Sequence, residues 1–215
     1  MGSSSAEVRG RWQASGTGTW YDAQRWSRNR ERDPRTVDKL LSKFLPSSGN
    51  GYASLLDAPC GTGRLRATIE HHGSFIGLDA SLSMLAAARR SDPSRLLAGD
   101  VERLPFADRT FDAAISCRLL HHLMDPDALA RAVRELVRVS KRLVLASFWD
   151  AGTLEARRRR LPLTRRPRHR GWHSRGEIRT AFGEAGAETI HFEQRIRFVS
   201  QQTWVVARCG GSRPS

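Results

Sequence analysis

One short segment constrains the fold more than any other part of this 215-residue chain. It reads SLLDAPCGTGRL and occupies residues 54–65. Its apolar first half has the length of a buried parallel strand. Gly61 and Gly63 then allow the backbone to turn tightly and to approach a ligand closely. Because a periodic segment follows at once, the pattern predicts a strand, a glycine loop and a helix. This is the layout of a nucleotide-type site at the carboxyl end of a parallel sheet.

The remainder of the chain continues this alternation of strand and helix. Short apolar segments predict five strands, at 53–57, 74–79, 95–100, 111–117 and 143–148. Periodic segments predict helices at 35–44, from the glycine loop to about 72, at 81–90, at 127–139 and from the capping box of Ser174 and Glu177.

Two further strands, at 188–199 and 201–208, are too close in sequence for a helix to cross between them. They are therefore expected to form an antiparallel hairpin at one edge. The whole pattern predicts an α/β fold: a doubly wound, mostly parallel, seven-stranded sheet with this antiparallel edge hairpin.

The composition predicts one domain with loose ends. Residues 1–19 are rich in Gly, Ser and Thr and are expected to be disordered, and residues 210–215 to form a loose tail. The domain itself is expected to span 20–209. Within it, residues 151–173 break the alternation of strand and helix, which predicts an Arg-rich insertion or lid.

The charge of the chain is strongly positive, at +14. Such a charge suits nucleic acid, an anionic membrane or an acidic substrate. Only three of the 36 basic residues are lysines, however, and GC-rich coding produces the same arginine excess. The segment from Arg157 to Arg175 concentrates nine arginines and no acid. It is interpreted either as a solvated loop or as a surface for an anionic acceptor.

Nothing in the sequence indicates a membrane span or a metal site. There is no run of 18 apolar residues, and the N-terminal residues lack the apolar stretch of a signal peptide. The three cysteines, at 60, 117 and 209, are odd in number and far apart, which fits neither a disulfide framework nor zinc. They fit a reducing compartment, so a cytoplasmic location is expected.

Small or polar residues end each of the first four predicted strands, where a doubly wound sheet binds ligands. They are Asp57, Asp79, the segment 99–101 and the segment 116–118. Asp79 lies 18 residues after Gly61, close to the spacing at which an acid binds ribose hydroxyls in such folds. The other interpretation of Asp79, a helix cap, is weakened because Ser81 already supplies one.

These segments resemble the motifs of class I S-adenosylmethionine-dependent methyltransferases. LDAPCGTG at 56–63 is similar to their first motif, and GLDAS at 77–81 to their second. GDVERLPF at 99–106, with Phe111-Asp112, is similar to the third. RLLHHL at 118–123 resembles the small-molecule subgroup that includes ubiquinone and menaquinone methyltransferases, type 11. The resemblance covers roughly 52–149.

The resemblance implies S-adenosylmethionine as cofactor and a set of residues that hold it. Backbone N–H groups near 61–63 suit the carboxylate of the cofactor, Asp57 its amine and Asp79 its ribose. Asp100 suits the adenine amino group, and Val101 covers the ring. The implied set is Tyr21, Trp26, Asp57, Ala58, Gly61, Thr62, Gly63, Asp79, Ala80, Met84, Asp100, Val101, Cys117 and Arg118. In this set Tyr21 and Trp26 belong to an N-terminal arm, which either packs on the core or covers the bound cofactor.

His121 and His122 are the candidate catalytic residues, because they follow the fourth strand, near the methyl group. Either could be a general base or an ordinary core histidine, and consecutive side chains diverge, so at most one should face the pocket. The implied function is methyl transfer to an O, N or C nucleophile of a small or lipid- or glycan-linked acceptor. The Arg-rich segment favours an anionic one.

Other functions fit less well. A nicotinamide dehydrogenase needs a third small residue where Arg66 stands. An RNA or protein methyltransferase could dock through the Arg-rich segment, but SCRL at 116–119 replaces the aromatic-proline tetrad of enzymes that methylate base nitrogens. A non-catalytic cofactor-binding subunit remains open, as does the oligomeric state.

Overall fold

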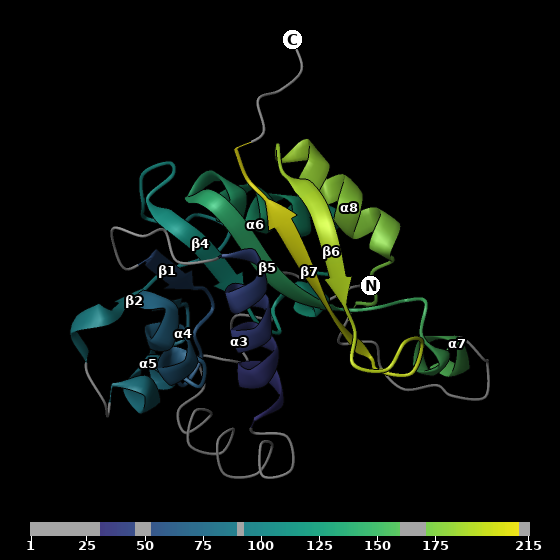
Figure 1. The fold of residues 1–215 in the computed structure, drawn as a ribbon, viewed down its shortest axis with the longest axis horizontal. Helices are drawn as coiled ribbons and strands as arrows, with labels where there is room; N and C mark the ends of the chain where they lie inside the picture. The colour runs from purple at the N-terminus through teal and green to yellow at the C-terminus, as the bar shows by residue number, and fades with distance from the viewer. Residues whose placement is uncertain (1–30, 46–52, 90–92, 160–170, 211–215) are drawn as a thin grey trace.

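A single mixed sheet organises the part of the chain that the structure describes. The computed structural model describes residues 31–45, 53–89, 93–159 and 171–210. Its seven strands lie in the order β3-β2-β1-β4-β5-β7-β6 (Figure 1). The predicted tail at 1–19, the residues Tyr21 and Trp26, and most of the Arg-rich segment lie outside the described residues.

Five strands are parallel and two form the antiparallel edge. The parallel strands are β1 (Ala53–Asp57), β2 (Gly73–Asp79), β3 (Leu96–Ala98), β4 (Phe111–Ser116) and β5 (Ser140–Trp149). The edge consists of β6 (Glu188–Glu193) and β7 (Gln202–Arg208). The strand order reverses between β1 and β4, which is where ligands bind in doubly wound folds. The predicted fold class is confirmed.

Six helices and two short 3-10 turns connect the strands in the described ranges. The helices are α3 (Arg32–Phe44), α4 (Arg66–His72), α5 (Leu82–Ala88), α6 (Pro126–Arg138), α7 (Leu154–Arg159) and α8 (Arg175–Glu184). The 3-10 turns are η1 (Pro93–Arg95) and η2 (Leu120–His122). None of the described helices is long and apolar enough to cross a membrane.

Apolar side chains cover both faces of the sheet. On one face, Leu136 of α6 and Phe182 of α8 pack with Phe148 of β5. On the other face, Leu41 of α3 packs in a second cluster with Phe75 of β2. All five side chains are fully buried. Helices therefore cover the sheet on both sides, as the near-continuous apolar strands predict.

Three strand boundaries differ clearly from the sequence predictions, for local reasons. The strand predicted at 188–199 ends at Glu193, because the Gln194 and Ser200 side chains accept backbone N–H groups in a turn that follows it. β3 begins at Leu96 and ends at Ala98, because η1 precedes it and Asp100 pairs back with Arg103 in a turn. β5 extends to Ser140–Trp149 instead of 143–148. Its second half pairs with β7 as far as Trp149, and this antiparallel pairing supplies the extra hydrogen bonds.

The two ends of the predicted insertion at 151–173 lie side by side. The Ala151 N–H donates to the His173 carbonyl at 2.9 Å, and the His173 N–H donates to the Trp149 carbonyl at 2.9 Å. Beside them, the Arg175 guanidinium binds the buried Asp150 carboxylate at 2.8 Å. One arginine of the Arg-rich segment thus has a structural partner.

The predicted capping box of α8 is present and gives a test of stability. The Ser174 hydroxyl accepts the Glu177 N–H, and the Glu177 carboxylate accepts the Ser174 N–H. Ser174→Ala should lower the free energy of unfolding by about 1 kcal/mol, measured by urea denaturation. Thr180→Ala, at an exposed position of the same helix, should not lower it. Equal stability of Ser174→Ala and wild type would contradict this role.

Candidate active site

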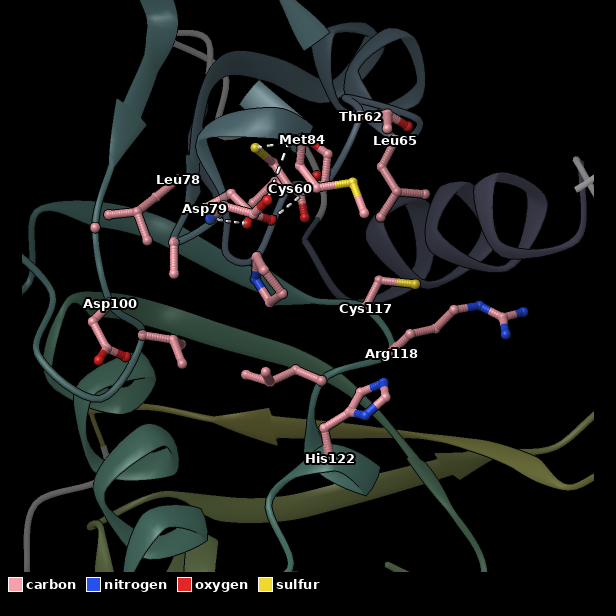
Figure 2. Close-up of a pocket in the computed structure, with 18 of the residues that line it drawn as sticks. Cys60, Thr62, Leu65, Leu78, Asp79, Met84, Asp100, Cys117, Arg118 and His122 are labelled. Carbon is pink, nitrogen blue, oxygen red and sulfur yellow. Dashed lines mark hydrogen bonds between the residues drawn. The ribbon is translucent and has the colours of Figure 1, made fainter. Parts of the chain in front are cut away.

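A pocket lies at the carboxyl ends of β1, β2 and β4, where the strand order reverses (Figure 2). Eleven of its lining residues belong to the predicted site: Asp57, Gly61, Thr62, Asp79, Ala80, Met84, Asp100, Val101, Cys117, Arg118 and His122. Ala58, Gly63 and His121 are not among the lining residues, and Tyr21 and Trp26 lie outside the described residues. The structure thus brings four separate loops together around one cavity.

The glycine loop is tied to the end of β2 by a hydrogen bond. Gly61 has φ +56° and Gly63 has φ +78°, a conformation that glycine adopts without strain. The Gly61 N–H donates to the Asp79 carboxylate at 2.8 Å, and the Gly63 N–H donates to the Cys60 carbonyl at 3.0 Å. Both N–H groups are therefore engaged inside the protein. This differs from the expectation that they hold a ligand carboxylate.

Asp79 is held in a fixed orientation at the bottom of the loop. Its second carboxylate oxygen accepts the Ser81 N–H at 2.8 Å. Ser81 in turn caps α5, because its hydroxyl accepts the Met84 N–H at 3.3 Å. Burial raises the pKa of Asp79, while the hydrogen bonds from Ser81 and Gly61 oppose that rise. The helix cap predicted at Ser81 is present, and Asp79 still lines the cavity.

Asp57 is the most unusual group in the pocket. Its side chain is 1% exposed, and neither carboxylate oxygen has a hydrogen-bond partner within the described residues. Burial raises its pKa from 3.8 to about 8, with Asp79 adding to the rise and Arg64 opposing it. Leaving a buried carboxyl group without a partner is costly. A ligand that brings a cationic donor to Asp57 would remove that cost.

An ion cluster at the edge of the pocket is absent from the sequence predictions. Asp33, at the start of α3, is 1% exposed. Its carboxylate lies 3.1 Å from the Arg64 guanidinium and accepts a hydrogen bond from Arg118 Nε at 2.7 Å. Both arginines line the pocket. Arg118 also has φ +61°, an uncommon value for a residue other than glycine. No local pattern around Asp33 indicates partners that lie far away in the sequence.

The two candidate catalytic histidines have different surroundings. His122 lines the pocket, and Figure 2 shows its ring turned toward the cavity. His121 is 3% exposed and stacks on Trp149, with ring centroids 4.5 Å apart and planes at 3°. The two histidine rings also contact each other at 4.3 Å. As expected for consecutive side chains, one faces the pocket while the other packs behind it.

The thiols of Cys60 and Cys117, which line the pocket, are protonated near neutral pH. Burial raises the pKa of Cys117 to about 12, and burial also raises that of Cys60. The thiolate is the nucleophilic form of cysteine, so both groups are inert near neutral pH. Within the described residues, no group of three or more His, Cys, Asp or Glu side chains is arranged to hold a metal ion.

Comparison with known proteins identifies the fold around this pocket. The methyltransferase domain family matches residues 56–145, from the end of β1 into β5. This match, together with the relatives and solved structures described below, supports a class I S-adenosylmethionine-dependent methyltransferase domain, type 11, over these residues. The family resemblance seen in the sequence motifs is thereby confirmed, and its match ends before the Arg-rich segment.

Curated methyltransferases that match this chain differ in what they act on. The chain is 38% identical over 95 residues to demethylmenaquinone methyltransferase of Corynebacterium kroppenstedtii, covering 44% of this chain and 41% of that protein. It is 36% identical over 114 residues to the tRNA (carboxymethyluridine(34)-5-O)-methyltransferase of Arabidopsis thaliana, covering 52% of this chain and 27% of that protein. The chain spans about half or less of the length of the curated relatives it matches.

Among solved structures, the fold is similar to that of magnesium protoporphyrin IX methyltransferase from Synechocystis PCC 6803 with bound SAH. The TM-score is 0.76 at 18% identity, and the match covers 96% of this chain and 100% of that one. This similarity extends over the antiparallel edge as well as the parallel strands. It supports the fold, while the roles of individual residues rest on the geometry described above.

The raised pKa of Asp57 predicts a dependence of stability on pH. Between about pH 4 and pH 8 the unfolded chain has lost the Asp57 proton while the ligand-free folded protein keeps it. Asp57 therefore makes the folded state less stable as pH rises through this range. Relative to wild type, Asp57→Asn should gain up to about 1.4 kcal/mol in free energy of unfolding per pH unit.

This gain is measured by urea denaturation of the ligand-free protein at several pH values. The exposed Glu184→Gln should keep the pH dependence of wild type. A constant difference between Asp57→Asn and wild type from pH 4 to 8 would show that Asp57 ionises normally in the fold.

Proposed function

We propose that this chain transfers the methyl group of S-adenosylmethionine to an O, N or C nucleophile of an anionic acceptor, small or lipid- or glycan-linked. The observation that carries the proposal is the buried Asp57 carboxyl group, which has no hydrogen-bond partner among the described residues and shares one cavity with Asp79. The amino group of the cofactor supplies the cation that Asp57 lacks. The methyl group comes from the sulfonium of the cofactor when it is bound.

The pocket residues suit the other parts of this cofactor. Asp79 keeps carboxylate lone pairs that can accept hydrogen bonds from the ribose hydroxyls. Asp100 suits the adenine amino group, and the Val101 side chain covers the ring. Both line the cavity beyond β3, on the far side of Asp79 from Asp57. Their order along the sheet thus follows the order of amine, ribose and base.

Arg64 is our candidate for binding the carboxylate of the cofactor. The Gly61 and Gly63 N–H groups donate within the protein, whereas the Arg64 guanidinium is a cation in the pocket lining near Asp57. A guanidinium forms strong paired hydrogen bonds with a carboxylate. Asp33 holds Arg64 from behind at 3.1 Å. Asp57 and Arg64 together would bind the two charges of an amino acid group.

The part that the protein plays in methyl transfer is mainly alignment. A reactive sulfonium needs a nucleophile placed in line with the methyl group, and a bound geometry of this kind supplies much of the acceleration. His122 is the lining side chain suited to take a proton from an oxygen or nitrogen acceptor. His121 and Trp149, stacked behind it, fix its position.

Positive charge supports an anionic acceptor. The Arg118 side chain lines the pocket, and Arg157 and Arg158 are exposed on α7, which follows β5 at the carboxyl end of the sheet. Three buried free thiols, at Cys60, Cys117 and Cys209, support the proposed location in a reducing cytoplasm.

Calorimetric titration tests how the cofactor is held. Wild type should bind S-adenosylmethionine more tightly than its decarboxylated analogue, because only the former has a carboxylate for Arg64. Arg64→Gln should lose about tenfold or more in affinity for S-adenosylmethionine and should bind the two ligands almost equally. Asp79→Ala is the matched contrast: it should weaken both ligands by a similar factor, since they share the ribose.

Absence of any binding by wild type would overturn the proposed cofactor site. An unchanged preference of Arg64→Gln for the carboxylated ligand would reject Arg64 as its partner and leave Asp57 and Asp79 in place.

Labelled methyl transfer tests the acceptor and the role of His122. With labelled cofactor and a cell extract, the label should enter the lipid or small anionic fraction and resist ribonuclease.

The acceptor isolated from that fraction then serves to test His122 as the general base. His122→Ala should lower kcat by about 10²–10⁴-fold with this acceptor, while cofactor affinity stays unchanged. His71→Ala, an exposed histidine on α4, should behave as wild type. Label recovered in RNA would contradict the proposed acceptor, and full turnover by His122→Ala would exclude it as base.

A further inference from the structure

Four large apolar side chains are exposed on two neighbouring segments of the described surface. Leu154, Ile196, Phe198 and Val199 are each more than half exposed, at 52–55%. They come from α7 and from the loop between β6 and β7. The Leu154 N–H donates to the Phe198 carbonyl at 2.8 Å, which holds the two segments together. Figure 1 shows them side by side at one edge of the molecule.

Hydrogen bonds within the loop between β6 and β7 hold the conformation in which these side chains are exposed. The Gln194 side chain accepts the Phe198 N–H at 3.2 Å and donates to the Ser200 carbonyl at 2.7 Å. The Ser200 hydroxyl accepts the Ile196 N–H at 3.1 Å. Phe198 also has φ +63°, a conformation that costs a bulky residue energy. A fixed, strained turn that displays apolar side chains indicates a binding surface.

Basic side chains lie between the apolar ones. Arg157 and Arg158 follow Leu154 on α7, and Arg195 and Arg197 alternate with the apolar residues of the loop; all four are exposed. Glu155 is the only acid in 151–158 and 194–201. We call these eight side chains the edge patch: Leu154, Arg157, Arg158, Arg195, Ile196, Arg197, Phe198 and Val199.

We propose that the edge patch docks the protein on an anionic phospholipid surface. Apolar side chains flanked by arginines bury their tips at the boundary of headgroups and acyl chains, while the guanidinium groups pair with phosphates. Each basic residue near such a surface adds to the attraction. A symmetric contact between two copies would bring eight arginines together, so charge disfavours self-association through this patch.

The directions of the strands show at which end of the sheet the edge patch lies. β7 is antiparallel to β5 and β6 is antiparallel to β7, so β6 ends at the same end of the sheet as β5. The edge patch and the pocket therefore share the carboxyl end of the sheet. Docking would turn this end toward the bilayer. That the acceptor is then drawn from the membrane rests on the proposed function, whereas docking itself does not.

Vesicle flotation without cofactor or acceptor tests the docking. The full chain should float with phosphatidylcholine vesicles that also contain phosphatidylglycerol, should not float with phosphatidylcholine alone, and should be released by salt. R195Q/R197Q should weaken binding by about 30-fold, at about fivefold for each arginine. Phe198→Ser should weaken it as well, by removing an apolar anchor. R89Q/R134Q and Leu82→Ser change exposed arginines and an exposed leucine elsewhere, and they should bind as wild type.

Three outcomes would overturn the proposal: no binding to the anionic vesicles, equal binding to both kinds of vesicle, or unchanged binding by R195Q/R197Q and Phe198→Ser. A wild-type dimer that these variants dissociate in sedimentation would assign the edge patch to a second copy instead. All variants should retain the cofactor affinity of wild type. Vesicle binding by a protein that binds no cofactor would refute the proposed function alone, and the reverse result would refute docking alone.

Discussion

The hydrogen bond from the Gly61 N–H to the Asp79 carboxylate fixes the geometry on which the pocket depends. It joins the loop after β1 to the end of β2, and Gly61 makes it with a positive φ. Burial raises the pKa of Asp57, and Asp79, held nearby, adds to the rise. Ionising Asp57 in the ligand-free pocket is therefore costly, and a cationic ligand group would reduce that cost.

The charge balance around the pocket extends this argument to α3. Asp33 is buried between Arg64 and Arg118, and each arginine comes from a different loop of the pocket. Removing one partner from a buried ion cluster leaves the others uncompensated. The start of α3 is therefore coupled to the loops after β1 and β4. The negative charge of Asp33 thus partly balances the positive charges of both arginines before any ligand binds.

The sequence predicts the sheet, the helix caps at Ser81 and Ser174 and most of the pocket, because those features depend on local patterns. Apolar segments ending in Asp57 or Asp79 indicate buried strands and the strand ends where ligands bind. The role of Asp33 has no such signal, since its partner Arg118 is 85 residues away and only the fold brings them together. The same limit applies to His121 and His122. Their adjacency predicts that at most one faces the pocket, and only the fold shows that it is His122, while His121 stacks on Trp149.

The antiparallel edge determines where the last part of the chain can act. A strand that runs antiparallel to β5 ends at the amino end of the sheet, so a loop that follows it lies away from the pocket. Because β6 is antiparallel to β7, it has the same direction as β5. The loop that carries Phe198 follows β6 and therefore lies at the carboxyl end of the sheet. There it contacts α7, which follows β5 directly, through the Leu154 N–H. The edge patch can therefore bring a bound surface to the same end of the sheet as the pocket, although none of its residues lines the pocket.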